Sequence, residues 1–513
     1  MKKTNGILYI LFGLIFITQK AFAMGVDEHV EKYFSPISDK FSDIIFTPIE
    51  IPGGDIPILI LLLIVASIFC TFYLRGIGIW GFKHSFYQIF HKKVNDGHKG
   101  EVSSFGALAT ALSGSIGLGN IAGVAIAISV GGPGAMFWMC MGALFGMALK
   151  FCEVTLALKY RHFNPDGSVS GGPMFYMERG LAQKGFHKLG KTFAYIFALA
   201  CIPGTFGGGC MLQTNQAAHQ FAVITGGENS FFATNAWVFG VIVSFIVGLV
   251  IVGGIKSIAK VTSKIVPVMC IIYILACLTI IAVHFTDIPR AIYTIIHEAF
   301  FPQAIYGGII GTIIMGLRRS IQSNEAGIGS SPIAYAAVKT DEPVSQGFVS
   351  MIEPFLDTVI VCSMTAFVII LTGEYLNYTQ GISGVELTSA AFASVKAMQF
   401  FPYILAVVII LFALSTMLSW AYYGQKAWTF LVGEGKKRIL CYQLVFCSFI
   451  IIGSCMSIKS VIDFTDATYL VMAAPNLIAI FIMLKDIKKE LISYCKKHDL
   501  IFRMNKKWFE NEQ

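Results

Sequence analysis

A cluster of glycines inside a long apolar segment constrains this chain more than any other feature. Residues 113–123 read Ser-Gly-Ser-Ile-Gly-Leu-Gly-Asn-Ile-Ala-Gly. Each glycine weakens a helix by about 1 kcal/mol relative to alanine. In a bilayer, non-helical backbone persists only where it is buried in protein or lines a wet cavity. We therefore predict a broken membrane helix, whose freed N–H groups bind an anion and whose freed carbonyls bind a cation.

The composition indicates a polytopic membrane protein. Apolar residues make up 55% of the 513 residues and charged residues 13%, whereas a soluble domain carries about 25% charged residues. The net charge of +8 comes from loops on one side, so it does not indicate a nucleic-acid partner. The cysteines occur singly, with no C-x-x-C pair, so we expect no disulfide framework, no bound metal cluster and no cofactor.

The amino terminus has the pattern of a signal peptide. Lys2 and Lys3 precede an apolar run at 7–17 and an Ala-Phe-Ala sequence at 21–23, which together predict a signal peptide over residues 1–23. An uncleaved signal anchor is the alternative. Residues 24–54 follow as a periplasmic amphipathic segment, with apolar residues near helical spacing.

Eleven apolar segments are each long enough to cross a bilayer. They lie near 55–74, 105–130, 133–159, 193–222, 236–253, 263–284, 304–322, 346–371, 402–430, 439–456 and 466–484. Alternate connections carry the lysines and arginines, which places the N-terminus outside and the C-terminus in the cytoplasm. We therefore expect an all-α, multi-pass inner-membrane protein, with a transmembrane domain over 55–485 and a basic cytosolic tail over 486–513.

A second interruption is predicted five spans after the first. Residues 306–316 are rich in glycine and run into a polar stretch that ends at Pro332. When the segment at 55–74 is set aside, the breaks fall in helices one and six of ten, which predicts an inverted five-plus-five repeat. The alternative is that the glycines only allow close helix packing.

Ionisable residues inside apolar spans are costly and usually paired. Lys150 and Glu153 lie one helical turn apart, so we expect an internal ion pair, with a proton relay as the alternative. Glu353 and Asp357 share one face and are interpreted as polar anchors. For two further carboxylates we expect a loop-fixing contact between Glu325 and an arginine, and an interfacial position for Asp466.

Four sequence motifs resemble the alanine or glycine:cation symporter family. They are Gly117-Leu-Gly-Asn-Ile-Ala-Gly-Val124, Gly131-Gly-Pro-Gly-Ala-Met-Phe-Trp138, Ser323-Asn-Glu-Ala-Gly-Ile-Gly-Ser330 and Ser415-Thr-Met-Leu-Ser-Trp-Ala-Tyr-Tyr-Gly-Gln425. The resemblance extends over roughly residues 50–485. It implies the leucine-transporter fold and sodium-driven uptake of small neutral amino acids, chiefly alanine and glycine.

The resemblance also implies roles for individual residues. The substrate would contact Leu118, Gly119, Gln213, Thr312, Met315, Gly316 and Trp420. Sodium, the coupling ion, would be bound by Ser113, Ser115, Ile116, Asn120, Ser415 and Thr416. Two departures stand out: many members carry threonine where this chain has Leu118, and the segment between Met315 and Asn324 is unusual. For Trp420 the alternative is a lipid-facing or interfacial tryptophan.

Other functions have less support in the sequence. An intramembrane enzyme would need a nucleophile–base pair or a metal cluster, and no Gly-x-Ser-x-Gly or His-Glu-x-x-His motif lies in a span. A channel or an amino acid sensor on the same scaffold stays open. The main rival is a proton-coupled symporter of another small solute. The expected partners are a small neutral amino acid, sodium and membrane lipid.

Overall fold

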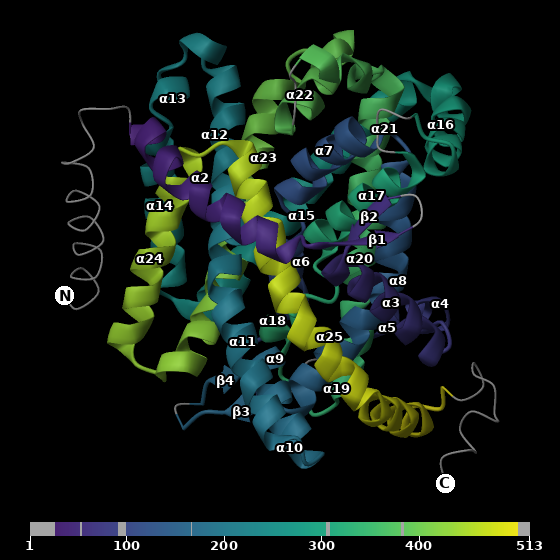
Figure 1. Cartoon of the computed structure of the whole chain (residues 1–513), viewed down its shortest axis with the longest axis vertical. Coiled ribbons are helices and arrows are strands. Elements are labelled where there is room, and N and C mark those ends of the chain that lie inside the picture. Colours follow the sequence, from purple (N-terminus) through teal and green to yellow (C-terminus); the bar gives the residue numbers. More distant parts are fainter. Residues whose placement is uncertain are drawn as a thin grey trace.

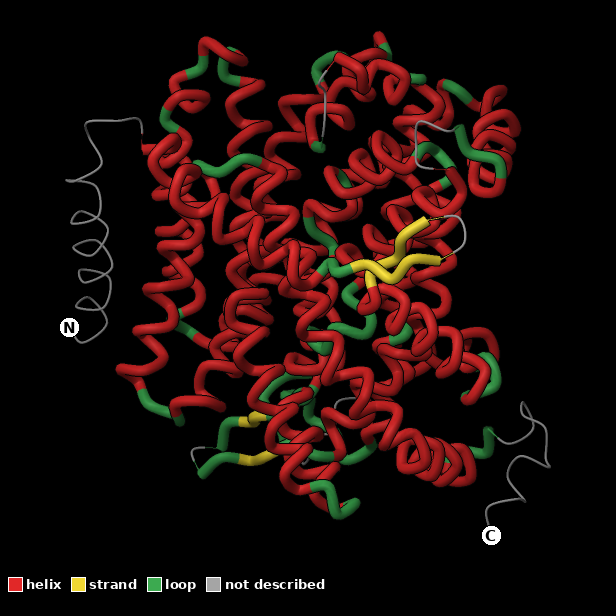
Figure 2. The backbone as a smooth tube through the Cα atoms, in the orientation of Figure 1, coloured by secondary structure: helices red, strands yellow, loops and turns green. Residues whose placement is uncertain are grey.

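The computed structural model describes residues 26–51, 54–90, 99–165, 167–303, 308–380 and 384–500. The predicted signal peptide at 1–23 lies outside the described residues. The described chain forms a helix bundle with two small antiparallel hairpins (Figures 1 and 2). Strand β1 (Pro48–Ile51) pairs with β2 (Gly54–Pro57), and β3 (His162–Phe163) pairs with β4 (Val169–Ser170). The predicted all-α class is confirmed.

The helices follow one another with short connections. In chain order they are α2 (Val26–Ile45), α3 (Ile58–Tyr73), α4 (Ile77–Trp80), α5 (Phe82–Phe90), α6 (Ser104–Ser115), η1 (Leu118–Asn120), α7 (Ala122–Gly131), α8 (Ala135–Lys159), α9 (Pro173–Phe175), η2 (Tyr176–Gly180), α10 (Leu181–Gln183), α11 (His187–Phe206), η3 (Gly207–Met211), α12 (Leu212–Ile224), η4 (Gly227–Asn229), α13 (Phe231–Thr234), α14 (Ala236–Ile251), α15 (Gly254–Val283), η5 (Phe285–Asp287), α16 (Ile288–Phe300), α17 (Gly308–Asn324), α18 (Pro332–Tyr335), α19 (Pro343–Ser350), α20 (Ile352–Pro354), η7 (Phe355–Cys362), α21 (Ser363–Thr372), η8 (Glu374–Gln380), α22 (Val385–Ser394), η9 (Lys396–Met398), α23 (Phe401–Val432), α24 (Lys436–Ser454) and α25 (Ile458–Lys497).

The apolar helices are long enough for a multi-pass membrane protein. Within the described residues, seven helices meet the length and hydropathy of a membrane span, and an eighth span is a bent pair. Each predicted segment coincides with one of these or with the shorter helices α3, α14 and α17. The count of eleven and the inverted repeat stay predictions. Helix α25 continues past the predicted end of its span, to Lys497, so the start of the predicted tail is helical.

The first predicted break is confirmed. Helix α6 ends at Ser115, and the segment Leu118–Gly131 leaves it at an angle of 54°. The change of direction falls inside the glycine cluster. A close turn follows, in which the N–H of Gly117 donates to Oδ1 of Asn120 at 3.0 Å.

The second break lies later in the chain than the glycines near 306–316 suggested. Helix α17 is continuous to Asn324, and the chain is non-helical from 325 to 331 before α18 begins. Gly327 and Gly329 adopt φ values of +91° and +82° there. A side chain is strained in that conformation, and a Cβ on Gly327 would also collide with Leu63. Glycine is therefore required at 327, whereas Gly311 and Gly316 lie inside the regular helix α17.

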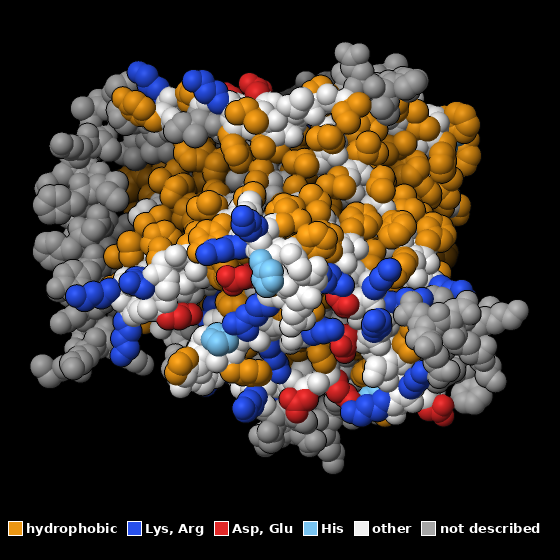
Figure 3. Space-filling model, turned by 60° about the horizontal axis from the view of Figure 1, so that its bottom comes forward, with side chains coloured by type: hydrophobic (Ala, Val, Ile, Leu, Met, Phe, Trp, Pro, Cys, Tyr) orange, Lys and Arg blue, Asp and Glu red, His pale blue; other side chains and the backbone are white. Residues whose placement is uncertain are grey.

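The surface is divided into an apolar band and a charged end. Figure 3 shows one face of the molecule, with its lower end tilted toward the viewer. Hydrophobic side chains cover the upper part of this face, and lysines and arginines gather toward the end that carries α10. Large apolar residues such as Ile242, Ile271 and Leu275 are more than half exposed. Such a band on a helix bundle is the surface that lipid covers. We call the two ends of the molecule the α10 end and the α22 end, after helices labelled at the bottom and top of Figure 1.

Candidate functional site

The turn between α6 and α7 holds the first group of predicted site residues. The N–H of Leu118 donates to Oε1 of Gln213 at 3.1 Å, and Nε2 of Gln213 donates to the carbonyl of Gly208 at 2.9 Å. Gly208 belongs to η3, a π-helical stretch of a long helix, and π-helical turns are frequent at functional sites. The structure thus brings together Leu118 and Gln213, two residues for which the resemblance implies contact with the substrate.

Hydroxyl and carbonyl oxygens gather between α6 and α23. Oγ of Ser113 donates to the carbonyls of Thr110 at 3.0 Å and Ser415 at 3.2 Å. Thr416 Oγ1 is buried and has no partner among the described residues. A Cβ placed on Gly117 would lie only 2.5 Å from that oxygen. We call Ser113, Ser415 and Thr416, together with the turn at Gly117, the α23 group.

The remaining predicted sodium residues differ in what their oxygens do. The hydroxyls of Ser115 and Ser415 donate to carbonyls of their own helices, Ala111 at 3.3 Å and Phe412 at 2.9 Å. Ile116 is buried and follows the last turn of α6, its N–H donating to Leu112 at 2.7 Å. Among these hydroxyls in the described chain, only that of Thr416 makes no hydrogen bond.

Asp357 is the centre of a second polar group. Its carboxylate is fully buried and accepts hydrogen bonds from Asn120 Nδ2 at 2.7 Å, Thr358 Oγ1 at 2.7 Å and Ser323 Oγ at 2.5 Å. We call Asn120, Ser323, Asp357 and Thr358 the Asp357 group. It joins the broken helix α6–α7, the end of α17 and the π-helical stretch η7.

The sequence placed Asn120 in this region but missed the other three members of the Asp357 group. Asp357 was interpreted only as a polar anchor, because the segment reads as an ordinary apolar span. The sequence does not show which helices pack against the helix that carries Asp357, so it gave no indication of what the carboxylate contacts. The available signal was the coincidence of a buried acid with the Ser323-Asn-Glu motif, and that pairing becomes visible only in three dimensions.

Residues at the end of α17 lie against Gly119 in the turn. A Cβ on Gly119 would lie 3.5 Å from both the carbonyl oxygen of Gln322 and Cα of Ser323. Gln322 is itself buried, and its Nε2 has no partner among the described residues. Gln322 is therefore a site residue that the sequence did not single out.

The predicted residues Thr312, Met315 and Gly316 lie about two or more turns earlier on α17. Met315 packs on Gly131, at the opposite end of α7 from the turn, and Gly316 packs on Ala135 of α8. Thr312 is buried. The structure does not bring these three to the turn, because the helix continues to Asn324 and the register of the unwound segment is shifted accordingly.

Trp420 lies between the two unwound segments. Its Nε1 donates to the carbonyl of Gly114 at 3.3 Å and to Oε1 of Glu325 at 3.0 Å. Its ring stacks on Tyr469 with centroids 5.0 Å apart and planes 5° apart. The side chain is fully buried, so the lipid-facing alternative is wrong.

Buried charges pair differently from the sequence expectation. Lys150 Nζ bonds to Glu353 Oε1 at 2.9 Å and to Ser331 Oγ at 2.7 Å, so its partner is not Glu153. Glu153 instead accepts from Asn476 Nδ2 at 2.6 Å. Helical spacing favoured the local pair, but the chain brings a better-placed carboxylate from α20. Removing one partner of a buried pair costs about 3–5 kcal/mol, so the Lys150–Glu353 pair holds α8 to α20.

Two further expectations about carboxylates are corrected. Glu325 contacts Ser330 and Trp420 and no arginine in the described structure. Asp466 is not interfacial: it is buried and forms ion pairs with Arg318, at 2.6 Å, and with Arg319. The arginines that follow the glycines of α17 therefore pair with Asp466 of α25 and not with Glu325 of the unwound loop.

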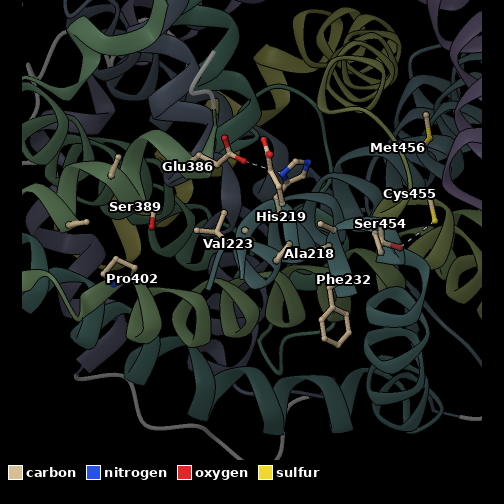
Figure 4. Close-up of a pocket in the computed structure, with 17 residues that line it drawn as sticks. Ala218, His219, Val223, Phe232, Glu386, Ser389, Pro402, Ser454, Cys455 and Met456 are labelled. Carbon is tan, nitrogen blue, oxygen red and sulfur yellow. Dashed lines mark hydrogen bonds and ion pairs between the residues drawn. The ribbon is translucent and has the colours of Figure 1, made fainter. Parts of the chain in front are cut away.

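A separate cavity of about 780 Å³ opens at the α22 end. Figure 4 shows His219 and Glu386 facing each other in it, and their side chains are 3.2 Å apart. Its walls come from α12, η4, α13, the start of α14, α22, α23 and the end of α24, and none of the predicted site residues lines it. We therefore assign the site to the unwound segments and not to this larger space.

The chemistry of the site is that of binding. In the described residues, no group of three or more His, Cys, Asp or Glu side chains is placed to hold a metal ion. What converges at the two breaks is a set of amide donors, hydroxyls, carbonyls and one buried carboxylate. Discontinuous core helices that meet around such groups define a secondary transporter.

The chain belongs to the sodium:alanine symporter family, which matches residues 43–506. Proteins of this family are transporters and not enzymes, and the function that they share is cation-coupled symport of amino acids.

Individual relatives agree with this assignment. The chain is 40% identical to the sodium/alanine symporter AgcS of Methanococcus maripaludis, covering 83% of this chain and 92% of that protein. It is 34% identical to the probable sodium/glutamine symporter GlnT of Bacillus subtilis, covering 86% and 88%. The fold is similar to that of MhsT, solved in complex with L-phenylalanine, with a TM-score of 0.58, 14% identity and coverage of 77% and 93%.

Proposed function

We propose that this protein is a sodium-coupled symporter that takes up small neutral amino acids such as alanine and glycine. The observation that carries the proposal is the Asp357 group. A fully buried carboxylate there contacts only neutral donors among its hydrogen-bond partners. A buried charge needs a counter-charge, and hard oxygen ligands suit an alkali cation. Sodium bound beside Asp357 would supply that charge.

The α23 group is the second proposed cation position. Thr416 Oγ1 has unused lone pairs and lies against the turn at Gly117. The carbonyl ends of α6 at Ser113 and Ile116 point along a helix axis whose C-terminal end carries partial negative charge. Together they offer oxygen ligands without a carboxylate, which fits a weaker site than the one at Asp357.

The substrate is proposed to lie between the turn and Trp420. The amides of Leu118 and Gly119 begin the second half-helix, where the helix dipole favours a carboxylate. Gln213 now accepts from Leu118 N–H, so it would release that donor as a carboxylate arrives. Trp420, stacked on Tyr469, would limit the side chain of the substrate to a small size.

We also propose an orientation in the membrane. Lysines and arginines gather at the α10 end (Figure 3), and basic residues favour the cytoplasmic side. The α22 end would then face outside, and both α17 and α25 would enter the membrane from that side. The chain would be a multi-pass protein of the inner membrane with its C-terminus in the cytoplasm.

Replacing sodium by choline at constant pH is expected to slow initial alanine uptake at least about tenfold in proteoliposomes. One sodium ion entering down 100 mV contributes about 2.3 kcal/mol, and a tenfold sodium gradient adds about 1.4 kcal/mol. That driving force can hold a neutral amino acid at several-hundredfold accumulation. Radiolabelled alanine uptake measures the effect, and an imposed pH gradient is the control. Uptake that follows the pH gradient and ignores sodium would favour the proton-coupled alternative.

A Trp420→Ala variant is expected to broaden the substrate profile. The space left by the indole would admit leucine and methionine, each methylene being worth about 1–3 kcal/mol in an apolar pocket. We expect leucine to inhibit alanine uptake about tenfold more strongly than in the parent. Trp420→Phe is the matched variant, because it keeps a ring on Tyr469 and should keep the profile narrow. Inhibition constants for alanine, serine, leucine and methionine that do not change in Trp420→Ala would contradict this role.

A further inference from the structure

Helix α2 lies across the face of the bundle where α17 and α25 meet. Figure 1 shows it crossing in front of α25 at the half of the molecule nearer the α22 end. The family match starts at residue 43, so nearly all of α2, Val26–Ile45, precedes the part of the chain shared with the family. Its contacts show what it holds.

One end of α2 caps α25. The carboxylate of Glu31 accepts from the N–H of Ser457 at 2.9 Å, from Ser457 Oγ at 2.6 Å and from Ser460 Oγ at 2.9 Å. Ser457 is the N-cap of α25, and an acidic group there is favoured by the helix dipole. Further along, Ser38 Oγ donates to the carbonyl of Ser460 at 2.8 Å. The start of α25 is therefore held by several polar contacts.

The middle of α2 adds an apolar contact to the same helix. The rings of Phe34 and Phe41 lie 5.1 and 6.1 Å from that of Phe464. The opposite face of α2 carries Lys32, Asp39, Lys40 and Asp43, all exposed. The helix thus turns an apolar side to α25 and a charged side outward.

The other end of α2 reaches α17. The ring of Phe46, directly after α2, lies 4.3 Å below the guanidinium of Arg318. Arg318 bonds to Asp466 at 2.6 Å and to Asp463 at 3.4 Å, both on α25. The β1–β2 hairpin then continues along α17 to α3. A single segment therefore touches both sides of the α17–α25 ion-pair cluster.

That cluster closes the space next to the site. Asp466 precedes Tyr469 by one turn of α25, and Tyr469 stacks on Trp420. Arg319 bonds to both Asp466 and Gln322, whose carbonyl oxygen lies against Gly119. The space among Arg318, Gln322, Asp466 and Leu470 is about 10 Å³, too little for a solute. The junction of α17 and α25 is therefore closed to a solute in this structure.

We propose that α2 and Phe46 form a strap that stabilises the closed state of the α17–α25 junction and slows its opening. This inference rests on the proposed transport function at one point, because it takes the α17–α25 junction to be a gate to the site. Phe46 holds Arg318 in the direction of Asp466, and Glu31 holds α25 in place at its start. Loss of either contact shifts the closed–open equilibrium toward the open state, because both are made in the closed state.

The test uses a Leu470→Cys variant, since Leu470 is a buried residue of the closed junction. Full-length protein in nanodiscs is treated with a charged thiol reagent, and mass spectrometry of the peptide that contains the introduced cysteine distinguishes it from the 12 native cysteines. We expect Phe46→Ala to raise the labelling rate about threefold to tenfold, and Glu31→Gln to raise it in the same direction. Phe46→Tyr keeps a ring under Arg318 and should restore the parent rate.

The control is Ile44→Ala, at a residue of α2 that is 72% exposed and should leave the rate unchanged. Labelling of Phe46→Ala and Glu31→Gln within twofold of the parent, or slower than it, would overturn the strap. The measurement needs neither alanine nor sodium, so it separates this inference from the proposed function. Adding both and finding no change in labelling in any variant would count against the proposed function and leave the strap standing.

Discussion

Replacing Asp357 by asparagine is expected to lower the apparent affinity for sodium by about 10- to 150-fold. The substitution keeps the size of the side chain and removes its charge. A hydrogen bond to a charged group is worth about 1.5–3 kcal/mol, and each 1.4 kcal/mol is a factor of ten. Because Asp357 is the buried charge that joins the broken helix to the end of α17, a bound cation would lose its main counter-charge. Alanine uptake as a function of sodium concentration measures the effect.

The control for this variant is Asp287→Asn, which makes the same chemical change at a carboxylate that is 53% exposed. Its sodium dependence should be that of the parent. A purely structural role for Asp357 predicts a different outcome: less folded protein, with an unchanged sodium concentration for half-maximal uptake in the fraction that folds. That outcome would show that sodium does not bind at the Asp357 group.

The sequence predicted the fold and the first break well, for a physical reason. Membrane helices form from long apolar segments, and the glycine cluster at 113–123 weakens the helix inside one of these segments. Both signals are patterns of neighbouring residues, so they can be read from the sequence without knowledge of tertiary contacts. The resemblance implied roles for Gln213 and Trp420 at the substrate site, and the structure brings both side chains to the unwound segments.

The second break shows where local signals end. Glycines near 308–316 look helix-breaking, yet Gly316 serves close packing, since a Cβ there would lie 2.5 Å from the carbonyl of Ala135. Whether a glycine breaks a helix or lets another helix approach depends on the neighbour. The residues of this part of the chain that lie against the first turn are consequently Gln322 and Ser323, later in the chain than Met315.

Charge pairing was the least predictable feature for a similar reason. Lys150 and Glu153 have ideal spacing for a local pair, but Lys150 bonds to Glu353, about 200 residues away. Asp466 likewise bonds to Arg318 and Arg319 across the bundle. In a buried setting an ion takes the partner that best compensates its lost hydration, and that partner is set by the tertiary fold.

A Gly117→Ala variant is expected to weaken alanine binding by about 5- to 150-fold. A methyl group there would lie 2.5 Å from Thr416 Oγ1 and 3.1 Å from Gln213 Oε1, so the turn or both side chains must move. Overpacking of this kind costs about 1–3 kcal/mol. Thr416 and Gln213 are the residues proposed to face sodium and the substrate carboxylate, so the displacement falls on the site itself. Binding of labelled alanine to purified protein, with saturating sodium, measures the loss.

Gly119→Ala is the matched variant, two residues away in the same turn. A Cβ at 119 meets its nearest neighbours at 3.5 Å, an ordinary contact distance, so alanine there should bind substrate within about threefold of the parent. Valine at 119 extends further and restricts the backbone, so Gly119→Val should lose binding while Gly119→Ala keeps it.

Both 117 and 119 variants should be monodisperse in detergent, since neither φ is in the left-handed region. Parent affinity in Gly117→Ala would show that the substrate and its ion do not bind at this turn. A loss in Gly119→Ala equal to that in Gly117→Ala would show that any methyl disrupts the turn, and that Thr416 and Gln213 have no particular part in binding.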